Sequence, residues 1–331
     1  MLRTPAFWPN KMPGVSAGSI LECIKASLDG SIHPHFNPVI EWSRSLVPFS
    51  GNMLELHFER IEAWFDFAYR INKDYDAPLL HSAHLPETVQ PFLLNDCHQL
   101  LQYSIPIFQY DIENICIEYD FPFGSPPALF LDLHRDKAFT PHKAYEDLKK
   151  LASHFQQPVH EELLNFFVKI KRAGLKVVYS GFMLSRKGES IRFTIEGVES
   201  DTLSKTISAL GWKGDYDVVA TLQQTYLQAD QRLVLCVDFD RQLGHKLGIE
   251  VHAPHGEPLL KKLFTNCIYD GEQYNLLKSW NGITALSHLL SKELTTLHQR
   301  SISCVYRRIN HFKFTLESSI ITTKAYLYYC F

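Results

Sequence analysis

Residues 307–331 read RRINHFKFTLESSIITTKAYLYYCF, and apolar and polar side chains alternate on both sides of the serine pair in this stretch. The apolar set is Phe312, Phe314, Ala325 and Leu327. The polar set is His311, Lys313, Lys324, Tyr326 and Tyr328. Because neighbouring residues of a strand point to opposite faces, a period of two predicts a hairpin with one apolar and one polar face.

Three earlier stretches repeat this strand, turn, strand pattern. They are NICIEYDFPFGSPPALFLDLHR (114–135), LKVVYSGFMLSRKGESIRFTIEG (175–197) and RLVLCVDFDRQLGHKLGIEVH (232–252). Helical spacing of apolar residues separates the hairpins at 145–155, 163–170, 203–210, 218–226, 259–264 and 286–297. The order is therefore helix, strand, strand, helix, at a period of roughly 55 to 75 residues, which is longer than in common solenoids.

The N-terminal part of the chain has no clear period. Residues 1–51 are rich in Pro, Gly and Ser and predict an irregular wrap with one short helix near 20–28. A helix is then expected from the cap residue Asn52 to Ala68, because apolar residues recur there at three and four positions. We expect one domain over 1–331, with 52–331 as the repeat region.

The repeat order favours a closed barrel. Consecutive hairpins pair antiparallel, and helices between them cover only one face of the sheet. Closing the sheet removes its edges and leaves a lumen lined by the polar face. An open sheet with a solvated polar face is the alternative, but several strands alternate Lys, Arg, Glu, His and Tyr rather than Ser, Thr, Asn and Gln. The predicted fold class is α+β, with repeated αββα units around an antiparallel barrel.

Composition excludes several functions. The 331 residues carry a formal net charge of −3, which does not favour nucleic-acid binding. No apolar run reaches the roughly 20 residues of a membrane helix, and prolines interrupt the first residues where a signal peptide would be apolar. The 7 cysteines form no C-x-x-C pair, so we expect reduced thiols and a cytoplasmic protein.

The repeat order resembles that of the ABBA prenyltransferases, the prenyltransferase-barrel family. The motifs that carry the resemblance are Lys324-x-Tyr326-x-Tyr328, Lys246-x-Gly248-x-Glu250 and His311-x-Lys313. The resemblance implies a lumen that binds a prenyl diphosphate and transfers the prenyl group to an aromatic small molecule or a peptide side chain. The family has five hairpins where four are evident here, so the fifth is expected before Asn95, with EWSRSLVPF (41–49) and its neighbours as candidates.

The chemistry of such a transfer selects residues on the polar faces. Ionising an allylic diphosphate needs cations and hydrogen-bond donors at the leaving group. The expected substrate-binding set is Arg192, Lys246, Lys313, Lys324, Tyr326 and Tyr328. Tyrosine faces, including that of Tyr179, can stabilise an allylic cation. A carboxylate must accept the acceptor's proton, and Glu118 and Glu250 are the candidates; the alternative is that each only neutralises a cation.

Two other functions stay open. A non-catalytic barrel that binds an apolar or peptide ligand has the same pattern, and Asp132, His134 and Asp136 suggest, more weakly, a metal-dependent hydrolase. Phosphate-loop, dinucleotide-binding and aspartate-rich terpene synthase motifs are absent from the sequence. The expected site contains no metal ligand and needs no cofactor, although Mg²⁺ can arrive with the diphosphate.

Overall fold

The structure is a computed structural model. It describes residues 16–28, 30–44, 46, 49, 51–60, 64–73, 112–123, 127–133, 139–184, 190–229, 231–252, 257–266, 270–286 and 304–330.

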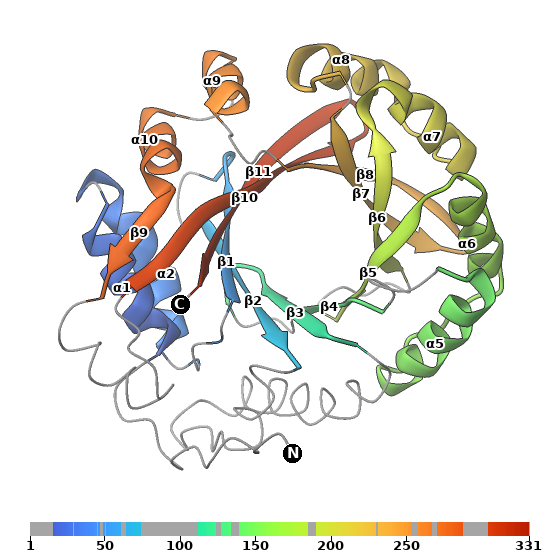
Figure 1. Cartoon of the computed structure of the whole chain (residues 1–331), viewed down its shortest axis with the longest axis horizontal. Helices are drawn as coiled ribbons and strands as arrows, with labels where there is room; N and C mark the ends of the chain where they lie inside the picture. Colours follow the sequence, from blue (N-terminus) through green and yellow to red (C-terminus); the bar gives the residue numbers. More distant parts are fainter. Residues whose placement is uncertain are drawn as a thin grey trace, which may run out of the picture.

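One antiparallel sheet of 11 strands organises these residues. The strands are β1 (Gly51–His57), β2 (Phe65–Asn72), β3 (Asn114–Tyr119), β4 (Ala128–Leu131), β5 (Lys176–Met183), β6 (Ile191–Glu199), β7 (Arg232–Asp240), β8 (Gln242–Val251), β9 (Gly282–Ala285), β10 (Cys304–Glu317) and β11 (Ile320–Cys330). Each strand from β1 to β7 pairs with the next strand in the sequence, and β8 pairs with β10. Figure 1 shows the strands as a ring.

Strand β11 closes the ring. It pairs with β10 on one side and with β1 on the other, where Glu55 lies opposite Tyr326 and Met53 opposite Tyr328. Strand β9 pairs only with residues 304–307 of β10 and is a branch outside the ring. Within the described residues the remaining ten strands form a closed antiparallel barrel, which confirms the predicted fold class.

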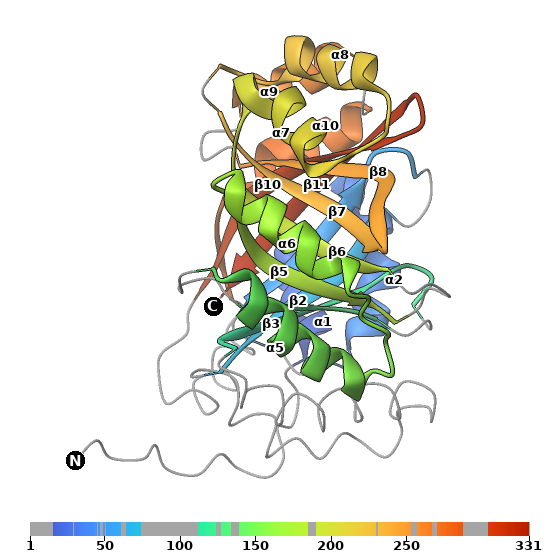
Figure 2. The ribbon, with the colours of Figure 1, turned by 90° about the vertical axis from the view of Figure 1, so that its right-hand side faces the viewer.

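Helices surround the barrel on its outer side (Figures 1 and 2). They are α1 (Ala17–Ala26), α2 (His33–Ser43), α5 (Pro141–His154), α6 (Glu162–Arg172), α7 (Leu203–Leu210), α8 (Tyr216–Tyr226), α9 (Glu257–Thr265) and α10 (Gly271–Trp280). Side-chain caps start several of them: Asp215 accepts two backbone N–H groups of α8, and Asp270 forms a capping box with Gln273 in α10. The predicted helices near 20–28 and within 145–264 are confirmed.

The two faces of each strand differ as the alternation predicts. On β6 the side chains of Ile191, Phe193 and Ile195 point outward under the helices and are at most 3% exposed. The intervening Arg192 and Thr194 line the lumen. Burial of the outward apolar faces against the helices holds the barrel together, because each helix covers its own apolar stripe on the sheet.

The N-terminal expectations were wrong in three places. Within the expected helix, residues 52–57 belong to β1 and residues 65–68 to β2, and this hairpin is the fifth strand pair, which lies before Asn95 as expected. The candidate stretch 41–49 does not supply it, since its first residues end α2. The segment before residue 51 is not irregular where it is described, because it contains α1 and α2.

Two further differences concern the region before β10. Helix α10 was not predicted. The expected helix at 286–297 lies outside the described residues except for its first position.

No helix in the described ranges combines the length and the apolar character that crossing a membrane requires.

Candidate functional site

The lumen contains two adjoining chambers that together hold all eight predicted site residues. The large chamber, of about 370 Å³, is lined by Glu118, Glu250, Lys313, Tyr326 and Tyr328 among others. The small chamber, of about 80 Å³, is lined by Glu118, Arg192, Lys246, Lys313, Lys324 and Tyr326 among others. Glu118, Cys236, Lys313 and Tyr326 line both chambers and mark the boundary between them. The residues gather there because each sits on the inward face of its strand.

Each of the four predicted cations is paired with a carboxylate. The Arg192 guanidinium donates two hydrogen bonds to Asp238, at 2.7 Å from Nε and 3.0 Å from Nη2, across the β6–β7 register. Lys324 donates to Glu55. Two further pairs are Lys313 with Glu250 at 3.4 Å and Lys246 with Glu317 at 3.0 Å. The lumen is therefore charged but locally neutralised.

Glu250 fits the alternative role, in which the carboxylate only neutralises a neighbouring cation. Burial alone would raise its pKa, but His311 and Lys313 outweigh burial and lower the pKa to about 2. Its Oε1 also accepts a hydrogen bond from Cys236 Sγ at 2.9 Å. A carboxylate held ionised in this way is a counter-ion and a weak base.

Glu118 has the opposite character. Burial, with the nearby Glu55 charge, raises its pKa to about 7. Within the described ranges no hydrogen bond or ion pair is formed by its carboxylate. Its cross-strand neighbours are Ala68 on β2 and Ala128 on β4, whose small side chains leave the carboxylate open to both chambers. A carboxyl group that titrates near neutrality and faces a cavity is suited to proton transfer.

Aromatic rings line the large chamber on opposite walls. Tyr326 is 5% exposed and stacks on His311, with ring centroids 4.1 Å apart. Lys313 Nζ lies 5.8 Å from the centroid of the Tyr326 ring, a cation–π distance. Tyr179 and Phe130 contribute to the same chamber from β5 and β4, and the inward orientation expected for Tyr179 is confirmed.

Several lumen residues were missed by sequence reasoning. Glu55 and Arg70 lie on the hairpin that was mistaken for a helix, so their inward faces went unnoticed. Arg70 and Arg308 both line the large chamber, and neither forms an ion pair with a described residue. The Nε of Arg70 is buried without a hydrogen-bond partner. The signal that could have found Arg70 is the strict alternation of FDFAYRIN over 65–72.

Of the three residues suggested for a hydrolase, the structure describes Asp132. Asp132 is 3% exposed, and its carboxylate accepts hydrogen bonds from the backbone N–H groups of Glu113 and Asn114 and from the Asn114 side chain. These bonds fix the ends of β3 and β4 and occupy the carboxylate. His134 and Asp136 lie outside the described residues.

No family model and no curated protein matches the chain. Among solved structures, the apo form of the prenyltransferase PriB is similar, with 11% identity, 95% of this chain and 94% of that chain covered, and a TM-score of 0.47. The PriB complex with L-tryptophan and dimethylallyl thiolodiphosphate has 12% identity over the same shares and a TM-score of 0.45. A 6-dimethylallyltryptophan synthase from Micromonospora olivasterospora has 9% identity, 94% and 95% coverage, and a TM-score of 0.48.

Proposed function

We propose that the chain transfers a prenyl group from an allylic diphosphate to an aromatic acceptor inside the barrel. The observation that carries the proposal is the position of Glu118, an open carboxyl group with a pKa of about 7 at the boundary of the two chambers. Arg192, Lys246 and Lys324 line only the small chamber, and Tyr179 and Tyr328 line only the large one. The division matches a substrate with a charged head and an apolar tail.

The small chamber would hold the diphosphate. As the carbon–oxygen bond breaks, its electron pair leaves with the diphosphate, and the ammonium groups of Lys313 and Lys324 stabilise the developing charge. The Arg192 guanidinium offers further N–H donors beside them. Because these cations pair with carboxylates in the free protein, the diphosphate replaces carboxylate oxygens as their partner. This exchange keeps the cations paired before and after substrate binds.

The large chamber would hold the prenyl cation and the acceptor. The Tyr326 ring, already beside the Lys313 ammonium, provides a face for the allylic cation. The acceptor carbon or nitrogen attacks the cation and forms the new bond, and its proton passes to Glu118. Glu118 must be ionised for this step, which sets a rise in activity through about pH 7.

The acceptor class follows from two arginines that line the large chamber. Arg70 and Arg308 are cations that no described carboxylate neutralises. The Arg308 guanidinium lies 5.3 Å from the centroid of the Tyr328 ring, so an aromatic surface and a positive charge are adjacent. We therefore propose an aromatic small molecule that carries an anionic group, in preference to a peptide side chain.

We propose that no resident cofactor is needed. A Mg²⁺ ion bound to the diphosphate is compatible with the carboxylates of Glu55, Asp120 and Asp238, which line the small chamber. Measuring the affinity for the diphosphate with and without Mg²⁺ shows whether the ion assists diphosphate binding.

The decisive experiment is calorimetric binding of dimethylallyl, geranyl and farnesyl thiolodiphosphates, which resist ionisation. Lys313→Met keeps the unbranched stem and removes the ammonium, and should weaken binding about 10- to 100-fold through loss of a charged hydrogen bond. Lys150→Met changes an exposed lysine of α5 and should leave the affinity unchanged. Turnover of dimethylallyl diphosphate with a panel of aromatic acids should then be abolished in Glu118→Gln. Binding without turnover for every acceptor would favour the non-catalytic barrel, and no binding would refute the proposal.

A further inference from the structure

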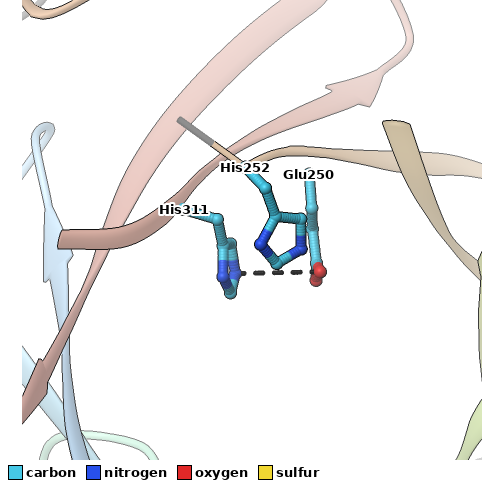
Figure 3. A group of neighbouring side chains, drawn as sticks. All are labelled: Glu250, His252 and His311. Atoms are coloured by element: carbon cyan, nitrogen blue, oxygen red, sulfur yellow. Dashed lines mark ion pairs between the residues drawn. The ribbon is translucent and has the colours of Figure 1, made fainter. Parts of the chain in front are cut away.

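A histidine pair and a carboxylate lie close together (Figure 3), and all three side chains line the large chamber. Glu250 and His252 are two residues apart on and just after β8, so both point inward. The register that pairs Phe312 with Val251 places His311 of β10 beside His252, and the two ring centroids are 5.0 Å apart. One ligand-type atom from each of the three side chains lies within 4.8 Å of the other two. Backbone pairing, and not loop conformation, brings the three together.

His311 has a ring nitrogen without a partner. Its side chain is deeply buried, at 6% exposed for the residue, and no hydrogen bond is made by its Nε2, which faces Glu250 Oε2 at 3.8 Å. The other ring nitrogen, Nδ1, lies 3.1 Å from the side-chain amide of Asn310. Turning this amide over lets the Asn310 oxygen accept from Nδ1–H and frees the Nε2 lone pair, the arrangement found for histidines that bind metals.

The remaining ligands are also available. Oε1 of Glu250 is engaged by Cys236 and by Lys313, which leaves Oε2 toward His311. His252 is exposed, and its ring contacts that of His311. Metal bonds of about 2.0–2.1 Å at tetrahedral angles put ligand atoms about 3.3 Å apart. The 3.8 Å between His311 and Glu250 needs to close by only about 0.5 Å.

We propose that Glu250, His252 and His311 bind one divalent first-row transition-metal ion, with Zn²⁺ as the best fit. Two histidines and one carboxylate form a ligand set typical of catalytic zinc, with a coordination position left for a ligand. That position faces the large chamber. The Lys313 ammonium, 3.4 Å from Oε1, weakens the affinity through repulsion but does not occupy Oε2. The argument for this ion rests on the three side chains alone and does not depend on the proposed prenyl transfer.

A second group of three similar residues does not support a site. His57 Nε2 lies 2.5 Å from Asp66 Oδ2, and Arg60 donates two hydrogen bonds to the same carboxylate. Glu55, the third member, accepts from Lys324. The three ligand atoms there are already hydrogen-bonded or ion-paired with one another, with Arg60 or with Lys324, in contrast to Nε2 of His311.

The test is equilibrium dialysis of chelator-treated protein against Zn²⁺, followed by metal analysis, with Co²⁺ absorption to report the ligands. The wild type should bind an ion that His252→Ala and Glu250→Gln lose, with affinity reduced by more than the roughly 10- to 100-fold that follows loss of a ligand's hydrogen-bonding partner. His245→Ala, an exposed histidine on the same strand β8, should bind as the wild type does.

Equal affinity in all of these proteins would place the ion elsewhere and overturn the proposal, as would absence of saturable binding. His311→Ala removes a buried ring that stacks on Tyr326, so this variant has the highest risk of misfolding. The His252→Ala variant is therefore the decisive one, because His252 is exposed. An unchanged far-ultraviolet circular dichroism spectrum verifies that this variant is folded.

Discussion

Replacing Glu118 by Gln should make the folded protein more stable at alkaline pH while it removes the proposed proton acceptor. The pKa of Glu118 is raised from 4.5 to about 7, so ionising this group is more costly in the folded state than in the unfolded state. A difference of 7 − 4.5, or about 2.5 pKa units at 1.36 kcal/mol each, corresponds to about 3 kcal/mol. The neutral amide of Gln avoids this cost in nearly the same shape.

The sign gives the effect a characteristic pH dependence. Because the folded pKa is the higher one, the folded state retains the proton between about pH 4.5 and 7, and wild-type stability decreases as pH rises through that window. We expect the gain from Glu118→Gln to be about 3 kcal/mol at pH 8 and below about 1 kcal/mol at pH 5. Urea denaturation at the two pH values measures both free energies of unfolding.

Glu196→Gln provides the matched control. Glu196 also lines the large chamber, from β6, but is exposed, so its substitution should change stability by less than about 0.5 kcal/mol at either pH. A Glu118→Gln protein no more stable than wild type at pH 8, or a gain equal at both pH values, would refute the reasoning. The carboxyl group would then be hydrated or paired, and no longer suited to accept a proton near neutrality.

Three further changes test the β11–β1 pairing that closes the barrel, the lumen wall, and the outer face of the sheet. Lys324→Ala leaves the buried Glu55 carboxylate without its ammonium partner and should cost about 2–3 kcal/mol in urea denaturation, most of it recovered when Glu55→Gln is added. Without that recovery, the loss would not come from the unpaired charge. In Gly181→Ala the new Cβ would lie 2.5 Å from the Phe130 ring, so we expect a cost of about 1–3 kcal/mol in thermal unfolding and weaker binding of the longer prenyl analogues; unchanged chain-length preference would contradict it. Phe193→Ala, on the outer face of β6 and 0% exposed, should cost about 3–5 kcal/mol, and a cost below 1 kcal/mol would show that this face does not pack on the helices.

Side-chain alternation was the most reliable signal in the sequence. It depends only on the pleat of a strand, so the inward positions of Arg192, Lys246 and Lys324 followed once the hairpins were recognised. The helices that pack on the outer face follow the same local logic, with apolar residues at three and four positions. Local periodicity therefore sufficed for most of the barrel after residue 114.

The first hairpin was missed because two periods compete in its sequence. Met53, Leu56 and Trp64 fit a helix, whereas Leu54, Leu56, Phe65 and Phe67 fit strands, and the strand pattern is interrupted by a turn. Tertiary context decides between them, because the barrel closes only if this segment pairs with β11. A stretch of sequence read by itself contains no information about that distant partner.

Pairing between lumen side chains was beyond the reach of sequence for the same reason. Glu118 and Glu250 looked equivalent as isolated carboxylates on polar strand faces. Their environments differ because β10 places Lys313 beside Glu250, whereas Glu118 lies between two alanines on β2 and β4. The register of neighbouring strands therefore decides which carboxylate is a counter-ion and which is free to exchange a proton.

The seam of the barrel and the proposed diphosphate chamber share residues. Strand β11 supplies Lys324 and β1 supplies Glu55, and their ion pair joins the two strands that close the ring. A diphosphate that draws Lys324 away from Glu55 would leave this buried carboxylate with only the His57 ring beside it, at 3.3 Å, which is costly in a site with little water. A divalent cation bound with the diphosphate would remove this cost, because it gives Glu55 a new partner. Mg²⁺ dependence of diphosphate binding, lost in Glu55→Gln, would therefore link closure of the barrel to the charge of its substrate.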